Sequence, residues 1–352
     1  MAWFLHCSGT RPNWVRSVFT SSQLPHLLER ALHATIVIPM KNTERWIGYA
    51  LSSVLSQDYK NIDVIVVDDG STDASRERAL RAGDSRVRVV DNVGTGIAAA
   101  WNLGASLARG ELLMRCDSDD VLPPTRVSSH ASWLGRHPEV GALAGACTMM
   151  DEQGRGIVRL PSEKKAEASV RSELCNGHID FHHQAITVRT HIARELGPAR
   201  PFFRIGEDTD FLLRLGERCD VWYEPAECYR ARLRGTSITH SVSEQELGWW
   251  GRVVLELQLQ RRTSGSDDLD REIEPKMPVF PCGKSISPSK QAQDLLIGVS
   301  WKQLLTGDVR AAFATGARAA LHRPVSYRAT INLGKLAVKA VLTGPKGERR
   351  AH

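Results

Sequence analysis

Residues 34–73 decide the fold of this chain, and they read ATIVIPMKNTERWIGYALSSVLSQDYKNIDVIVVDDGSTD. The run at 34–39 is apolar and β-branched, and the run at 62–67 repeats this pattern, as expected of strands buried on both faces. Between them, apolar residues recur every three or four positions from Ile47 to Leu55, which predicts a helix with one buried face. The stretch therefore predicts a strand, a helix and a second strand.

The same alternation continues to residue 116. The pattern predicts strands over 87–90 and 111–116, a polar helix over 72–81, and an apolar-faced helix over 97–108. Alternating strands and helices build right-handed parallel units, so we predict an α/β fold with a mostly parallel sheet flanked by helices. Ligands bind beyond the carboxyl ends of such strands. The positions that matter for chemistry therefore follow residues 39, 67, 90 and 116.

The rest of the chain divides by composition. Residues 1–33 have no clear period and are interpreted as an N-terminal extension, and 34–245 as the α/β domain. Residues 246–352 are interpreted as a linker followed by a basic helical C-terminal region. Within them, 263–290 are rich in Ser, Asp, Pro and Gly, and 309–321 keep helical apolar spacing.

Composition narrows the class of protein. Apolar residues make up 42% and charged residues 24% of the chain, which is typical of a globular protein with its own core. Because no apolar run approaches the roughly 18 residues of a membrane-spanning helix, none is expected. The seven cysteines form no CxxC pair, which argues against a zinc ribbon or a thioredoxin-type site and favours reduced thiols in the cytoplasm.

The positive charge gathers at the C-terminal end. Residues 301–352 hold ten Lys or Arg and only two acidic residues, whereas the remainder of the chain is slightly acidic. This basic region predicts peripheral contact with anionic headgroups at the inner face of a membrane. A solvated helical surface is the alternative that charge alone leaves open. Nucleic acid is not an expected partner.

Two carboxylates follow the second predicted strand. Asp68 and Asp69 precede a Gly-Ser turn that leads into a helix. A carboxylate in this place can accept hydrogen bonds from a nucleobase or from a ribose hydroxyl. The alternative is an ordinary turn with a helix cap.

A second acidic cluster follows the fourth predicted strand. Asp117 and Asp119 point to the same side of an extended segment, where like charges repel unless a cation lies between them. Ligand sets made only of oxygen suit Mg²⁺ or Mn²⁺. The alternative is a surface loop with Asx turns.

Two further segments carry candidate residues. Gly94 and Gly96 follow the third predicted strand and allow a ligand to approach the backbone, but no G-x-G-x-x-G follows the first strand, which disfavours a Rossmann dehydrogenase. Glu207 and Asp208 precede an apolar helix, where acidic residues are favoured by the helix dipole. The functional interpretation is that one of these two carboxylates is a general base.

Together these motifs resemble a family 2 glycosyltransferase. The resemblance is carried, in order, by VVDDGSTD at 66–73, GIAAAWNLGASLARGELLMRCDSDD at 96–120, FHHQAITVR at 181–189, GEDTDFLLRL at 206–215 and YRARLRGTSITHS at 229–241. It implies a GT-A fold that moves a sugar, with inversion, from a nucleotide-diphosphate sugar to a hydroxyl of a glycan or lipid-linked acceptor. It also implies a divalent cation, Mg²⁺ or Mn²⁺.

The resemblance assigns roles to individual residues. Asp208 is the implied catalytic base, with Glu207 beside it in the acceptor pocket. Asp119 is implied to bind the metal, Asp117 to complete the pair, and Asp69 to contact the nucleotide base. The remaining residues assigned to the nucleotide sugar are Pro39, Lys41, Asn42, Asp68, Gly94, Asn102, Arg115, Asp117, Ser118, Arg232 and Arg234.

Two departures from the family pattern keep other functions open. Lys41 stands where an aromatic residue is usual, and Trp101 where many members carry Arg. They motivate the alternative of a degenerate domain that binds nucleotides or acts as a scaffold. A sugar-phosphate nucleotidyltransferase is a second alternative, disfavoured because residues 39–43 contain no glycine.

Overall fold

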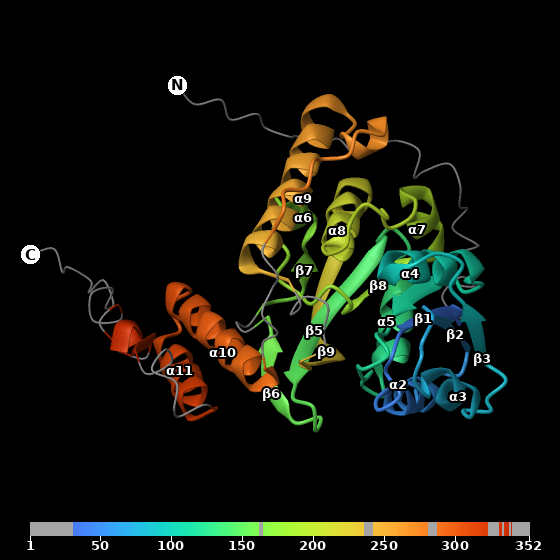
Figure 1. Ribbon diagram of the computed structural model, residues 1–352, viewed down its shortest axis with the longest axis horizontal. Helices are drawn as coiled ribbons and strands as arrows, with labels where there is room; N and C mark the ends of the chain where they lie inside the picture. Colours follow the sequence, from blue (N-terminus) through green and yellow to red (C-terminus); the bar gives the residue numbers. More distant parts are fainter. Residues whose placement is uncertain are drawn as a thin grey trace, which may run out of the picture.

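The computed structural model describes most of the chain (Figure 1). The described residues are 31–161, 165–235, 242–280, 287–322, 331–332, 334–337 and 339. The predicted N-terminal extension therefore lies outside them, except for its last three residues.

The first half of the described chain alternates strand and helix, as predicted. Its elements are β1 (Ala34–Met40), α2 (Ile47–Leu55), β2 (Ile62–Asp68), α3 (Ser75–Leu80), β3 (Val87–Asp91), α4 (Gly96–Leu107) and β4 (Leu112–Arg115). β1 pairs in parallel with β2 and β4, and β2 pairs in parallel with β3. The helix predicted over 72–81 starts only at Ser75, because the residues before it form a turn that binds the β1–α2 loop. In this turn the Thr72 N–H donates to the Asn42 side chain (2.8 Å).

The second half makes the sheet mixed. Its elements are α5 (Arg126–Arg136), β5 (Ala142–Met150), β6 (Gly156–Leu160), β7 (Ala168–Ser169), α6 (Arg171–Cys175), β8 (Ile186–Arg189), α7 (Thr190–Leu196), α8 (Glu207–Arg218) and β9 (Val221–Arg232). The strand order in the described sheet is β3-β2-β1-β4-β8-β5-β9-β7, with β6 paired to β5. β8 runs antiparallel to both β4 and β5, while β5 and β9 are parallel.

Each face of the sheet has its own apolar core. Ile36 and Ile38 of β1 point to the side covered by α2, α3 and α5. Val37 points to the opposite side, covered by α4, α6, α7, α8 and α9. Gly104 lets α4 lie close to the sheet, because a Cβ there would come within 2.2 Å of Val37. Because successive side chains of β1 enter opposite cores and both cores are buried, the sequence of β1 does not alternate between apolar and polar residues.

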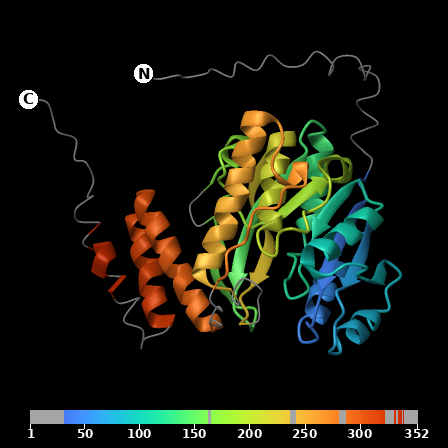
Figure 2. The same ribbon diagram turned by 45° about the horizontal axis from the view of Figure 1, so that its top comes forward.

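The C-terminal helices differ in how they attach. α9 (Glu244–Ser264) buries Trp250, Val253 and Val254 in the core of the α8 side (Figure 2). It therefore packs on the α/β domain, although most of it lies beyond residue 245. After the short η3 (Leu269–Arg271), α10 (Pro288–Leu305) and α11 (Val309–His322) form a hairpin beside β6. Figure 1 shows this hairpin at the end of the molecule opposite β3. α10 begins within the stretch predicted to be a linker, where Ser287 caps the helix and Pro288 takes its first position.

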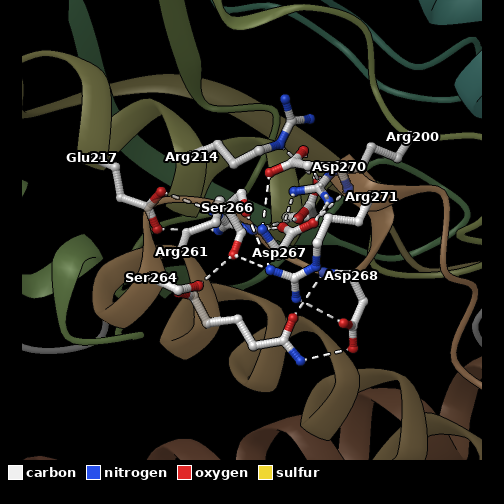
Figure 3. A network of polar contacts seen from close by, with 12 residues as sticks. Arg200, Arg214, Glu217, Arg261, Ser264, Ser266, Asp267, Asp268, Asp270 and Arg271 are labelled. Carbon is white, nitrogen blue, oxygen red and sulfur yellow. Dashed lines mark hydrogen bonds and ion pairs between the residues drawn. The ribbon is translucent and has the colours of Figure 1, made fainter.

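A network of buried ion pairs fixes α9 against α8 (Figure 3). Asp267, whose side chain is fully buried, lies 2.7 Å from Arg200 and 2.5 Å from Arg261. Arg261 of α9 also reaches Glu217 of α8 (2.8 Å). Although burial disfavours the charged carboxylate, the hydrogen bonds from Arg200 and Arg261 lower the pKa of Asp267 to about 2. The ion pairs of the network thus offset the hydration that these charged groups lose on folding.

The described residues also bear on two expectations from composition. The five described cysteines are all free thiols. Every helix described is too short or too polar to cross a bilayer.

Candidate active site

The first cavity of the site lies at the carboxyl ends of β1, β2 and β4, where the strand pattern predicts ligand binding. It has a volume of about 530 Å³. It is lined by Pro39, Met40, Lys41, Asn42, Asp69, Gly96, Ile97, Ala100, Asp117, Ser118, Asp119 and Arg234. Asn42 adopts a left-handed backbone (φ 49°) and orders the β2–α3 turn by accepting hydrogen bonds from Thr72.

Asp69 is held in place on the floor of this cavity. Its carboxylate accepts hydrogen bonds from Lys41 (2.9 Å), from the Asn92 side chain (2.7 Å) and from the backbone N–H of Gly96 (3.0 Å). Although partial burial opposes ionisation, these three donors hold the pKa of Asp69 below its ordinary value. The result is an oriented, ionised acceptor facing the cavity.

The acidic loop after β4 is anchored from β9. The hydroxyl of Tyr229 donates to Asp120 (2.7 Å) and accepts from the backbone N–H of Asp117 (2.9 Å). The other oxygen of Asp120 accepts from the backbone of Arg232 (2.7 Å). Both carboxylate oxygens of Asp120 therefore accept hydrogen bonds from β9, whereas Asp117 and Asp119 each line both cavities of the site.

The two carboxylates that face the cavities are each paired with arginine. Asp117 lies 2.7 Å from Arg115, and Asp119 forms an ion pair with Arg234. Burial, with Asp117 close by, raises the pKa of Asp119, while Arg234 opposes this rise. A neighbouring arginine therefore offsets part of the negative charge of each carboxylate.

The second cavity adjoins the first and has a volume of about 370 Å³. Ile97, Asp117, Asp119 and Arg234 line both cavities. The residues that line the second alone include Arg115, Asp120, His182, His183, Gln184, Arg204, Glu207, Asp208 and Arg232. Carboxylates from three distant parts of the chain thus lie along one continuous hollow, with Asp119 at its middle.

Asp208 lies in the first turn of α8 and is paired with a histidine. Gly206 adopts a left-handed backbone (φ 90°) just before the helix, so that the chain turns sharply into it. His183 Nδ1 lies 3.0 Å from an Asp208 oxygen. Burial opposes both charges, but the attraction between the two groups raises the pKa of His183 and lowers that of Asp208. Asp208 is therefore ionised and oriented at neutral pH.

Glu207 has the opposite electrostatic environment. Its side chain is buried and lies 3.6 Å from Arg115. Burial, together with the neighbouring charge of Asp208, raises the pKa of Glu207 to about 7. The adjacent carboxyl groups of Glu207 and Asp208 therefore differ in pKa, and Glu207 is the one more easily protonated.

Five residues that the sequence analysis assigned to the nucleotide sugar lie apart from the first cavity. Arg115 lines the second cavity and pairs with Asp117. Asn102 exchanges two hydrogen bonds of 2.8 Å with the backbone of Ala199. Gly94 forms a turn with Asn92. Asp68 accepts from the Ser71 backbone. Arg232 lines the second cavity but donates to the carbonyls of residues 119, 151 and 152.

The structure also brings in residues that the sequence analysis did not assign. His183 and Gln184 reach Asp208, and Tyr229 holds the acidic loop. His183 lies in the segment FHHQAITVR at 181–189, which carries part of the family resemblance, so the sequence held a signal for it. For Tyr229 the signal was only its place in the closing segment at 229–241.

Comparison with known proteins agrees with this architecture. Residues 35–194 match the model of glycosyl transferase family 2. The chain is 40% identical over 99 residues to glycosyltransferase GlyG of Streptococcus pneumoniae serotype 4, covering 27% of this chain and 33% of GlyG. It is 38% identical over 101 residues to the Escherichia coli UDP-Glc:alpha-D-GlcNAc-diphosphoundecaprenol beta-1,3-glucosyltransferase WfgD, covering 28% of this chain and 40% of WfgD. The matches thus span less than half the length of either relative.

A solved structure shares the fold. S. aureus TarS 1–349, in complex with UDP-GlcNAc, superposes with a TM-score of 0.56 at 16% identity, covering 88% of each chain. The strand order, the helices on both faces and this likeness define an α/β domain of the GT-A type. Residues 35–194 thus form a glycosyl transferase family 2 domain, as the motifs predicted.

Proposed function

We propose that the protein transfers a sugar from a nucleoside-diphosphate sugar to a hydroxyl group of a glycan or lipid-linked acceptor, with inversion at the anomeric carbon. The observation that carries this proposal is the pair of joined cavities with Asp119 common to both. A donor in the first cavity and an acceptor in the second would meet at that residue. The names of TarS, which was solved with UDP-GlcNAc, and of WfgD, which uses a diphosphate-lipid acceptor, support this choice of substrates.

The donor's nucleoside fits the first cavity. Asp69 presents an ionised acceptor for base or ribose donors, and Lys41, about half exposed, offers a positive charge beside it. Pro39, Asn42 and Ser118 complete the wall. These contacts bind the part of the donor that does not react, and binding there positions the reacting carbon.

Asp208 is the proposed general base of the transfer. It is ionised, held by His183 and turned into the second cavity, where it takes the proton of the attacking hydroxyl. A single displacement needs no covalent enzyme intermediate, so the configuration inverts. Glu207 would hydrogen-bond the acceptor beside it.

The residues of the acidic loop fit a divalent cation in part. Among the described residues, no group of three His, Cys, Asp or Glu side chains is arranged to hold a metal. Mg²⁺ and Mn²⁺ in transferases are commonly held by one or two carboxylates, and diphosphate and water fill the other positions. Asp119, with Asp117, would hold such a cation, which would stabilise the charge on the departing diphosphate.

A nucleotide-sugar screen tests the function and its metal together. We expect one nucleoside-diphosphate sugar, with Mn²⁺, to raise the Tm of the protein, because a ligand that binds only the folded state stabilises it. EDTA is expected to remove that shift and to stop turnover, and added Mn²⁺ is expected to restore both. If turnover were undiminished in the presence of EDTA, the proposed role of the divalent cation would be wrong. A protein that releases pyrophosphate from a nucleoside triphosphate and a sugar phosphate would instead be a nucleotidyltransferase.

The C-terminal hairpin is the proposed contact with a membrane that presents lipid-linked acceptors. Leu305 and Leu321 are about three-quarters exposed on a hairpin that also carries Arg310 and Arg318. Each basic residue near an anionic surface contributes roughly 1 kcal/mol. We expect the protein to float with anionic vesicles and not with neutral ones, and the pair Leu305→Ser and Leu321→Ser to weaken flotation. Equal recovery with both vesicle types would contradict this contact.

A further inference from the structure

Arg126 is a fully buried cation that lines neither cavity. It is the first residue of α5 and is 1% exposed, yet it forms no salt bridge with any described residue. One of its terminal nitrogens donates to the carbonyls of Gln184 (3.0 Å) and Ile186 (2.9 Å). A buried guanidinium without a carboxylate is costly, so its bonds and neighbours must offset that cost.

Its second neighbour is the ring of Tyr229. The guanidinium carbon of Arg126 lies 5.2 Å from the centre of that ring, within the range of a cation–π contact. The imidazole of His182 also stacks on Tyr229, with ring centres 5.4 Å apart. The ring is thereby fixed, and with it the hydroxyl that binds Asp120 and the N–H of Asp117.

Arg126 therefore contacts the supports of both halves of the site. It contacts the ring of Tyr229, whose hydroxyl holds the loop that carries Asp119. It also donates a hydrogen bond to the carbonyl of Gln184, in the turn that carries His183. The side chains of Gln184 and His183 lie 3.5 and 3.0 Å from the Asp208 carboxylate. Arg115 joins the acidic loop to the start of α8 from within the second cavity, through Asp117 and Glu207. Arg126 joins the residues that support these two parts, and His182, which also stacks on Tyr229, belongs to the supporting turn itself.

We propose that Arg126 is a positioning residue that sets the distance between the acidic loop and the His183–Asp208 pair. It touches neither cavity, and it acts only through Tyr229 and the backbone of residues 184–186. The inference rests on the proposed function, in which the acidic loop and the His183–Asp208 pair act in the same sugar transfer. Misplacement of reacting groups by about 1 Å costs on the order of 10²-fold in rate.

A second arginine provides a matched control. Arg189 also donates only to backbone carbonyls around α5, namely those of Val140 (2.8 Å), Leu134 (2.7 Å) and His137 (3.0 Å). It lies at the opposite end of the helix, away from both cavities. Replacing either arginine removes the same kind of bond, but only Arg126 contacts Tyr229 and the carbonyl of Gln184.

The experiment compares Arg126→Met, Arg126→Lys and Arg189→Met. We expect Arg126→Met to lower kcat on the order of 10²-fold while the donor KM changes less than about threefold, because binding contacts remain. Arg126→Lys, which keeps the charge, is expected to recover part of kcat. Arg189→Met is expected to lower Tm but to leave kcat within about twofold. An equal loss of kcat in the two Met variants would overturn the inference.

A measurement without turnover separates this inference from the proposed function. In ¹⁵N-histidine spectra, with His183→Gln used for assignment, we expect Arg126→Met to lose the signal of His183 bonded to Asp208, and Arg189→Met to keep it. An unchanged His183 signal in Arg126→Met would refute the positioning role. A wild-type protein that transfers no sugar would refute the function instead, and the spectra would still decide the role of Arg126.

Discussion

Asp208→Asn is expected to lower kcat by about 10²–10⁴-fold, the usual contribution of a general base. The amide retains the shape of the side chain and can still accept from His183, so the geometry at the start of α8 is kept. What is lost is the ability to take the proton of the acceptor hydroxyl. The measurement is kcat for transfer, alongside calorimetry of nucleoside diphosphate binding with Mn²⁺.

The counterpart variant is Asp69→Asn, which should show the reverse pattern. Asp69 lies in the first cavity among donors that orient its charge, so its loss is expected to raise the donor KM more than it lowers kcat. If Asp208→Asn weakened nucleotide binding as much as turnover, Asp208 would belong to the donor site, and the role of base would be wrong.

The second large effect concerns stability. Asp267→Asn is expected to lower the free energy of unfolding by up to about 3–5 kcal/mol, because the buried Arg200 and Arg261 lose the carboxylate that lies nearest to both. Asp210, which contacts both arginines, and Glu217, which contacts Arg261, remain and limit the loss. Urea unfolding at neutral pH measures this loss. Asp268→Asn is the control, since Asp268 pairs with Arg271 at the surface, where an ion pair contributes roughly 0–1 kcal/mol.

The effect of Asp267 should also depend on pH. Its pKa in the folded protein is about 2, below the value of about 3.9 expected for an unfolded chain. A lowered pKa stabilises the fold fully above the unfolded pKa, and this stabilisation is lost as the pH falls through the folded pKa. The difference between wild type and Asp267→Asn should therefore narrow between about pH 4 and pH 2. A difference that stays constant over this range would mean that packing, and not charge, is responsible.

Much of the first half of the fold could be predicted from the sequence, because its patterns are local. The first three strands over 34–116 are short β-branched runs, and the fourth is an apolar run that ends at Arg115. The helices over 47–55 and 96–107 have their own apolar stripes, and the candidate site residues follow the strand ends. The same reasoning placed Asp69 and Asp119 at one edge of the sheet, where the structure has them.

The rest depends on contacts between distant residues. β8 is inserted antiparallel between β4 and β5, a choice that no local pattern dictates. Asn102 has the spacing of a site residue, but the backbone of Ala199, 97 residues later, takes both of its hydrogen bonds. The environment of Asp208 likewise depends on His183, which the folded chain alone brings beside it.

The hairpin of α10 and α11 joins the sheet through a small seam. Ile157 on β6 meets Ala292, Leu296 and Ala319 there, and Lys302 reaches Asp180 nearby. Since the free energy of apolar burial scales with area, so few side chains bind the hairpin weakly compared with the double core of the sheet. Substitutions in the appended helices should therefore cost the sheet, which carries the proposed site, little of its stability.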